Sequence, residues 1–188
     1  MKKPGILLAS LLFAATTLYS QPSTAQTTVS NWHAKLNQQL PLLGHRNWIL
    51  IVDSAYPLQV SPGIEVIDTG ADHLAVTRAV LSALDRSIHV KPIVYLDAEL
   101  PWVPAQKFPN LEAYRNALKT TLQGLPTQSL PHEQIIGKVS ETGKEFKVLV
   151  LKTNMAMPYT SVFLQLDCKY WGAEDEQKLR QTMKSSPK

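Results

Sequence analysis

The segment from Gly44 to Asp53 contains the residue types best suited to chemistry. His45 is a side chain that exchanges protons near neutral pH, so it can act as a general acid or base. Asp53, eight residues later, can fix the tautomer of a histidine or accept a hydrogen bond from a ligand hydroxyl. Each residue also has a structural interpretation, His45 as a solvated turn residue and Asp53 as the cap of the following loop.

The residues between them, Trp48 to Val52, are large and apolar without interruption. A run with no period of two predicts a strand that is covered on both faces. Asp53 then falls at the carboxyl end of that strand, where open α/β sheets usually bind their ligands. Five strand residues span about 16 Å, so we expect His45 and Asp53 to lie near opposite ends of one strand.

The remaining pattern alternates helices with strands, which indicates an α/β layered fold with a mostly parallel sheet flanked by helices. Strands are expected at 48–52, 64–67, 88–96, 146–151 and 159–166. Helices are expected at 30–40, from Asp72 to about 84, from Asn110 to about 122, and briefly from Pro131. Thr142-Gly143-Lys144 reads as a turn. Residues 100–110 hold three prolines and predict a rigid connection whose aromatics, Trp102 and Phe108, pack against the domain rather than cover a pocket.

The amino-terminal segment predicts a secretory signal peptide over residues 1–25. Lys2 and Lys3 precede a short apolar run that is too short to cross a bilayer, and small residues at 23–25 offer a cleavage site after Ala25, with Ser20 as the alternative. We therefore expect an exported protein, periplasmic or secreted, with no membrane association after cleavage. Residues 26–172 form a single domain, and the charged tail 173–188 either frays or packs as a terminal helix.

Composition excludes several function classes. The net charge of +4 includes the two leader lysines, and so weak a bias does not predict nucleic-acid binding. Cys168 is the single cysteine, so no internal disulfide forms, and the histidines lack metal-ligand spacing. We expect neither a metal nor another cofactor.

Four further polar residues are expected at the surface without a role: His73, His89, Asp97 and Glu99.

Three motifs resemble the ribose pyranase/fucose mutarotase (RbsD/FucU-like) family. The first is Leu43-Gly44-His45 with its strand, Asp53 and Ala55-x-Pro57. The second, 158–164, resembles the family's terminal Tyr-Ala/Gly-Asn-x-x-Leu strand, and the third, 131–134, resembles the Thr-His-Glu-x-Phe stretch of the pyranase branch. The resemblance spans roughly residues 30 to 168, and only the motifs at 43–57 and 158–164 are distinctive.

The resemblance implies cofactor-free interconversion of the anomers or ring forms of a monosaccharide, in homo-oligomeric rings of five or ten subunits. His45 would be the catalytic acid/base. The sugar would be bound by the following residues: Asp53, His132, Tyr159, Thr160 and Ser161. Because His45 and Asp53 are expected at opposite ends of one strand, we expect each site to be shared between neighbouring subunits.

The sequence departs from the family pattern at two places. Ser161 stands where asparagine is usual, and 152–155 replaces an Arg/Lys-x-Gly-Glu turn. These departures slightly favour the alternative of an exported carbohydrate-binding or interaction protein that keeps the fold without catalysis, whereas the retention of His45, Asp53 and Tyr159 favours the enzyme. His132 and Tyr159 likewise have structural interpretations, as a helix-start residue and as a core aromatic.

Overall fold

The computed structural model describes residues 31–185. The predicted signal peptide, 1–25, lies outside these described residues. Within them, no helix is both long enough and apolar enough to cross a membrane.

A six-stranded sheet forms the centre of the domain, in the order β2-β5-β1-β6-β3-β4. The strands are β1 (Trp48–Val52), β2 (Ile64–Asp68), β3 (Val90–Asp97), β4 (Thr127–Leu130), β5 (Val148–Lys152) and β6 (Val162–Cys168). Strand β6 runs antiparallel to both of its neighbours, β1 and β3, and every other pairing is parallel. The predicted mostly parallel sheet is therefore confirmed.

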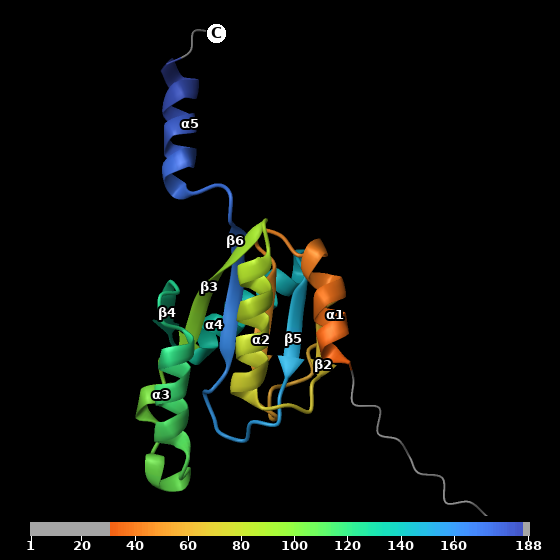
Figure 1. Ribbon diagram of the computed structural model, residues 1–188, viewed down its shortest axis with the longest axis vertical. Helices are drawn as coiled ribbons and strands as arrows, with labels where there is room; N and C mark the ends of the chain where they lie inside the picture. The colour runs from red at the N-terminus through yellow and green to blue at the C-terminus, as the bar shows by residue number, and fades with distance from the viewer. Residues whose placement is uncertain (1–30, 186–188) are drawn as a thin grey trace, which may run out of the picture.

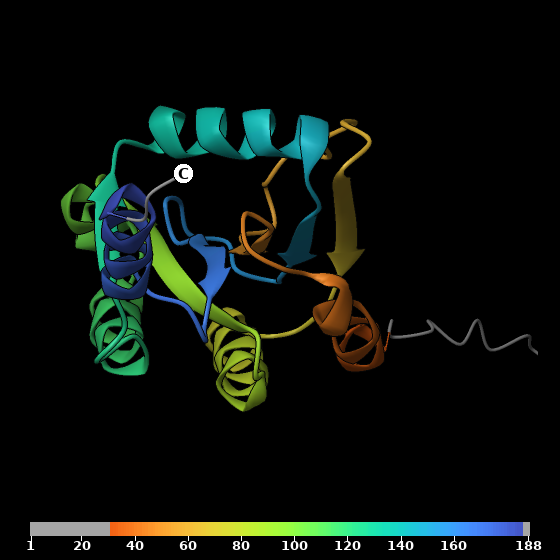
Figure 2. The same cartoon turned by 90° about the horizontal axis from the view of Figure 1, so that it is seen from above.

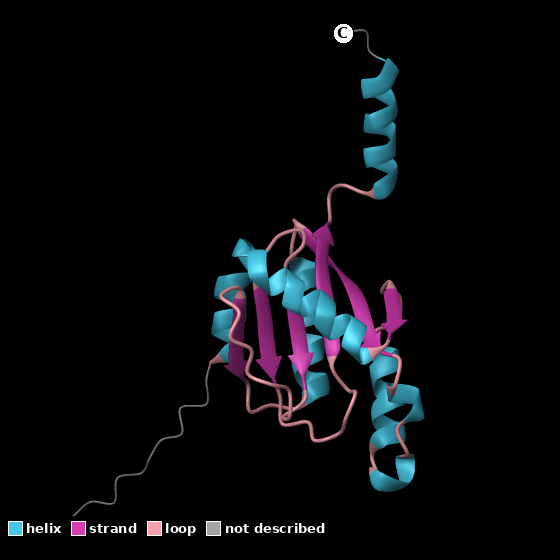
Figure 3. Cartoon of the chain, turned by 180° about the vertical axis from the view of Figure 1, so that it is seen from behind, coloured by secondary structure: helices cyan, strands magenta, loops and turns pink. Residues whose placement is uncertain are grey.

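Helices cover both faces of this sheet (Figures 1 and 2). The helices are α1 (Trp32–Gln39), α2 (His73–Arg86), α3 (Leu111–Thr121), α4 (His132–Glu145) and α5 (Ala173–Ser185). Helices α1, α2 and α3 lie on one face, and α4 alone crosses the other (Figure 2). Three short 3-10 helices, η1 (Leu40–Leu42), η2 (Leu100–Trp102) and η3 (Ala105–Lys107), lie in the connections. Helix α5 buries no side chain and extends away from the sheet (Figure 3).

The run from Trp48 to Val52 forms β1, and all five of its residues are buried. Successive side chains of a strand point to opposite faces, so Ile49 and Ile51 pack in the core under α1, α2 and α3. Trp48, Leu50 and Val52 pack in the second core, under α4. Burial on both faces is why this strand has no polar period.

Helix α4 is longer than expected and runs through the predicted turn at 142–144. A Cβ on Gly143 would lie only 2.6 Å from Cγ1 of Ile64. The glycine thus lets α4 approach the loop before β2 closely, and its backbone carbonyl accepts the N–H of Gly63 at 3.1 Å. The turn prediction was wrong because this glycine serves close packing rather than a change of chain direction.

Strand β4 was not predicted. Its sequence, Thr-Gln-Ser-Leu, forms the outer edge of the sheet beside β3, and three of its four residues are exposed. An exposed edge strand needs no apolar pattern, so it gives little sequence signal. Its position matters because the chain passes directly from its end, Leu130, into α4.

Candidate functional site

One edge of the sheet gathers most of the predicted site residues. Because β6 is antiparallel, its first residue, Val162, pairs with both Ile51 near the end of β1 and Leu96 near the end of β3. Asp53 and Asp97 therefore flank the segment 159–161 that enters β6. We call this end of the sheet the carboxyl edge. Parallel strands place ligand sites at this end.

The carboxylate of Asp53 makes two contacts at the carboxyl edge. Its Oδ1 accepts a hydrogen bond from the backbone N–H of Ala55 at 2.8 Å, so it does cap the following loop. Its Oδ2 lies 3.5 Å from Oγ of Ser161. The structure thus brings together two residues that are 108 positions apart in the chain.

Asp97 and His132 form a hydrogen-bonded pair beside them. Nδ1 of His132 lies 3.1 Å from Oδ1 of Asp97, whose side chain is 1% exposed. The second carboxylate oxygen of Asp97 is buried and has no hydrogen-bond partner among the described residues. Burial raises the pKa of Asp97 to about 6, and the nearby His132 partly opposes this rise.

Glu99 fixes the backbone of the same histidine. Both of its carboxylate oxygens accept the backbone N–H of His132, at 3.0 and 3.1 Å, which satisfies a donor at the start of α4. The expectation that Asp97 and Glu99 are surface residues without a role was wrong. Asp97 ends β3 much as Asp53 follows β1, so the argument from strand ends that singled out Asp53 applied to it as well.

The ring of Tyr159 lies edge to face with that of His132. The two ring centroids lie 5.5 Å apart at an interplanar angle of 81°, and Tyr159 is 38% exposed. Its φ of 57° is left-handed, a conformation that costs a non-glycine residue about 1–3 kcal/mol and is concentrated at functional sites. Tyr159 is therefore not a core aromatic, and its backbone is held in a strained form beside His132.

Thr160 supports this turn from inside the protein. Its hydroxyl donates to the carbonyl of Met157 at 2.8 Å, and its own carbonyl accepts from the Tyr114 hydroxyl at 2.7 Å. That hydroxyl oxygen also lies 3.2 Å from Nδ1 of His73, whose Nε2–H donates to the carbonyl of Ile51 at 3.2 Å. The hydroxyl and the carbonyl of Thr160 are thus both hydrogen-bonded within the protein.

His73 was expected at the surface but is fully buried. It lies at the start of α2, where Asp72 caps the helix as predicted, and it connects β1 to the Tyr114 hydroxyl. Burial lowers its pKa to about 4, so it is neutral at pH 7. His73 precedes the buried residues Val76, Val80 and Leu84 by three, seven and eleven positions, so the helical period of the apolar face was a signal that could have indicated its burial.

His45 lies at the opposite edge of the sheet. Its Nδ1–H donates to Oδ1 of Asp167, near the end of β6, at 3.0 Å, and its side chain is 57% exposed. Its loop is firmly held, because the Nε2–H of His89 donates to the carbonyl of Leu43 at 3.0 Å. The loop does not fold back toward Asp53, so His45 and Asp53 are apart within one chain.

Two neighbours of His45 differ from the sequence analysis. His89 is half-buried rather than a free surface residue, and Asp167 was not singled out from the sequence.

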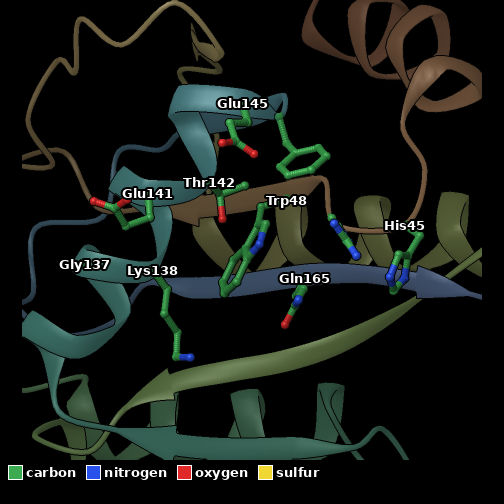
Figure 4. A pocket seen from close by; sticks show the side chains of 10 residues that line it. His45, Trp48, Gly137, Lys138, Glu141, Thr142, Glu145 and Gln165 are labelled. Carbon is green, nitrogen blue, oxygen red and sulfur yellow. The ribbon is translucent and has the colours of Figure 1, made fainter. Parts of the chain in front are cut away.

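A hollow of about 720 Å³ opens beside His45, between α4 and the sheet. Figure 4 shows His45 at one end of it, with Gly137 and Lys138 of α4 toward the other. Trp48 and Gln165 also line it. None of the other predicted site residues reaches this hollow, so it and the carboxyl edge are two separate regions of one subunit.

The described residues contain no group of three or more histidine, cysteine, aspartate or glutamate side chains placed to hold a metal ion. Cys168 is free and half-buried.

Comparisons with known proteins identify the fold. No known family model matches the sequence, and no curated protein is significantly similar to it. The structure of Bacillus subtilis RbsD complexed with D-ribose aligns with a TM-score of 0.50 and 20% identity, over 70% of this chain and 90% of that one. The fucose mutarotase of Streptococcus pneumoniae in complex with L-fucose gives 0.47 and 17%, over 74% and 96% of the two chains. FucU from Bifidobacterium longum gives 0.47 and 16%, over 70% and 92%.

At 20% identity the first of these likenesses is one of fold, and it confirms the fold that the sequence motifs predicted. The chain has the fold of the Bacillus subtilis RbsD structure.

Proposed function

We propose that this chain interconverts the anomers or ring forms of a free monosaccharide by acid/base ring opening and re-closure. The observation that carries the proposal is the gathering of Asp53, Ser161, the Asp97–His132 pair and Tyr159 at the carboxyl edge. These groups offer hydroxyl-binding oxygens, a proton-transfer group and a flat aromatic face within one small area. Such a combination suits a sugar, whose faces carry C–H groups and whose rim carries hydroxyls.

The chemistry needs one group that takes a proton and one that gives it. The base removes the proton of the anomeric hydroxyl while the acid protonates the ring oxygen, and the bond between the anomeric carbon and the ring oxygen breaks. Re-closure from the other face, or through another hydroxyl, reverses both transfers. Histidine performs either role near neutral pH, so one imidazole can take the proton of the anomeric hydroxyl and then deliver that proton to the ring oxygen, and the two transfers balance.

Both candidate histidines have the same local arrangement. His45 and His132 each direct Nδ1 at a carboxylate, of Asp167 and Asp97 respectively. A carboxylate on Nδ1 keeps the proton on that atom, leaves Nε2 free to accept one, and stabilises the imidazolium that then forms. We assign His45 as the catalytic acid/base, with His132, Asp53, Tyr159 and Ser161 binding the sugar, and Thr160 holding the turn that carries Tyr159 and Ser161.

Because His45 lies at the far edge of its own sheet, the proposal includes a shared site. His45 of one subunit would complete the carboxyl edge of a neighbour in a ring of five or ten subunits, and the hollow beside His45 leaves room for that approach. The proposal also places this reaction outside the cytoplasm, on the basis of the signal peptide predicted for residues 1–25.

The test is exchange between anomers, measured by saturation transfer or line broadening of anomeric proton signals in NMR. D-ribose and L-fucose are the first sugars to use. Wild type should accelerate exchange, His45→Ala should remove the acceleration, and His33→Ala, which changes an exposed histidine of α1, should retain it. Binding without faster exchange would instead identify a carbohydrate-binding protein, and neither binding nor exchange with a broad monosaccharide panel would refute the proposal.

A further inference from the structure

The connection after β3 forms a second hollow, which adjoins the carboxyl edge. It has a volume of about 340 Å³, within the range of small-ligand pockets. Its apolar wall consists of Trp102, Val103, Pro104, Phe108, Pro158 and Tyr159. Glu99 and Lys107 add one acidic and one basic group to the lining. We call this the aromatic hollow.

Trp102 is the most unusual residue of the aromatic hollow, because it is 84% exposed. The sequence predicted that it packs against the domain, and that prediction was wrong. Phe108, the other aromatic of this connection, does pack against the main core while also lining the hollow. An exposed tryptophan gains little from folding, and such residues are enriched where proteins bind other molecules.

The protein holds Trp102 in this exposed position. Leu100 and Val103, on either side, are buried in the core, and the Arg115 side chain donates to both of their carbonyls, with Nη2 2.7 Å from the carbonyl oxygen of Val103. The backbone that carries Trp102 is thus anchored at both ends by packing and by a charged donor. Because the backbone is already fixed, only the side-chain torsions of Trp102 remain to be ordered when a ligand stacks on the ring.

The aromatic hollow is continuous with the proposed sugar site. Tyr159 belongs to both, because it lines the hollow and its ring lies edge-on to His132. Glu99 likewise lines the hollow while its carboxylate accepts the backbone N–H of His132. A ligand that occupies the site at His132 therefore has the aromatic hollow immediately beside it.

We infer that the aromatic hollow binds a second sugar ring, so that the site accepts the reducing end of a disaccharide or short oligosaccharide as well as a free monosaccharide. This inference rests on the proposed function. A reducing disaccharide keeps the free anomeric hydroxyl that ring opening requires, while its second ring is attached through another hydroxyl. Tryptophan offers the broad apolar face on which the C–H side of a sugar stacks, and Glu99 and Lys107 can bind hydroxyls at its rim.

The test compares disaccharides with their component monosaccharides on the full-length protein. Cellobiose, maltose and lactose serve as probes, with glucose and galactose as the single-ring references. Two readouts are used: anomeric exchange by NMR, and the shift of the Trp102 indole N–H signal on titration. At least one disaccharide should bind about tenfold more tightly than its monosaccharides, which corresponds to one added aromatic stacking contact.

Three variants locate the effect. Trp102→Ala should remove the tenfold preference for the disaccharide, and Trp102→Phe should restore part of it. Trp171→Ala changes another exposed tryptophan, next to α5, and should keep the wild-type preference. Because Trp102 is exposed, its replacement should leave the fold intact, which the amide NMR spectrum checks.

The outcomes separate this inference from the proposed function. A shift of the Trp102 indole signal by a disaccharide, without anomeric exchange of any sugar, would support the aromatic hollow while refuting catalysis. Exchange of monosaccharides with no preference for any disaccharide would refute the hollow as a sugar site and leave the proposed function standing. Dissociation of a wild-type oligomer by Trp102→Ala would also overturn the inference, because Trp102 would then belong to an interface between subunits.

Discussion

Asp97 and His132 are joined by a hydrogen bond of 3.1 Å at the carboxyl edge, although 35 residues separate them in the chain. The carboxyl group ends β3 and is almost fully buried, whereas the imidazole begins α4 and is partly exposed. A buried carboxylate behind an accessible histidine is the arrangement that stabilises an imidazolium. The same pair therefore affects both the pH dependence of folding, through Asp97, and the proposed sugar site, through His132.

The burial of Asp97 predicts a pH-dependent stability. Its pKa rises from the ordinary 3.8 to about 6 on folding, so the folded state holds a proton that the unfolded state has released between these values. The contribution of Asp97 to the free energy of unfolding is therefore fully present below pH 3.8. This contribution is lost as the pH rises through about 6. The pKa difference between the folded and unfolded states corresponds to roughly 3 kcal/mol of unfolding free energy.

Asp97→Asn isolates this contribution because it cannot titrate. Relative to the variant, wild type should lose roughly 3 kcal/mol of unfolding free energy between about pH 4 and pH 6, with no further change above. Urea unfolding followed by tryptophan fluorescence at each pH measures the difference, in which titrating groups remote from Asp97 cancel; His132, which is hydrogen-bonded to Asp97, is followed separately by NMR in both proteins. A difference that stays constant across this range would show that Asp97 does not titrate there.

Asp167 is expected to position His45. Asp167→Asn keeps the shape of the side chain but removes the charge that holds the proton on Nδ1. Exchange should therefore fall about 10- to 100-fold in kcat/KM, by analogy with the carboxylates that orient metal-ligating histidines. Nitrogen-15 NMR of His45 should show a loss of the Nδ1–H tautomer even without substrate. Lys91→Met, which removes a cation 4.0 Å from the other Asp167 oxygen, should change the rate far less; an unchanged tautomer in Asp167→Asn would contradict the positioning role.

Mixing two inactive variants tests whether the sites are shared between subunits. His45→Ala lacks the acid/base, and Asp53→Asn lacks a charged ligand at the carboxyl edge, so each alone should be nearly inactive. If a site takes His45 from one subunit and Asp53 from the next, hybrids contain some complete sites. Refolding an equal mixture should then restore up to about a quarter of the wild-type rate by random pairing of subunits. A mixture as inactive as its components, in hybrids shown by mass spectrometry to have formed, would place both residues in one subunit's site.

The two glycines of α4 should respond oppositely to alanine. Gly143→Ala places a Cβ 2.6 Å from Ile64 and should cost about 1–3 kcal/mol, as overpacking does. Gly137, in the same helix, has open space at its Cβ position, so Gly137→Ala should stabilise by about 0.5–1 kcal/mol through helix propensity. Urea unfolding of both variants measures their changes in unfolding free energy. Equal changes would mean that the loop before β2 moves to accommodate the new Cβ at position 143.

The sequence alone predicted the features that depend on local pattern. The buried strand β1, the position of Asp53 at its end and the separation of His45 from Asp53 all follow from the apolar run between them, because strand length and burial are properties of consecutive residues. The helix cap at Asp72 and the α/β layering follow from the same kind of signal. Thr142-Gly143-Lys144 shows the limit of that signal, since a glycine needed for close packing has the same local pattern as a turn glycine.

Only the tertiary structure decided which polar groups meet. Asp167 is 122 residues from His45, and their contact depends on an antiparallel β6 inserted between β1 and β3. The same strand order brings Asp53 and Asp97 to either side of Tyr159, and an exposed edge strand with no apolar pattern delivers His132 to Asp97. These contacts are long-range consequences of strand pairing, and no periodicity within a single segment encodes them. The sequence thus named the residues of the proposed site, and the order of the strands determined which carboxylates, Asp97 and Asp167, lie against its histidines.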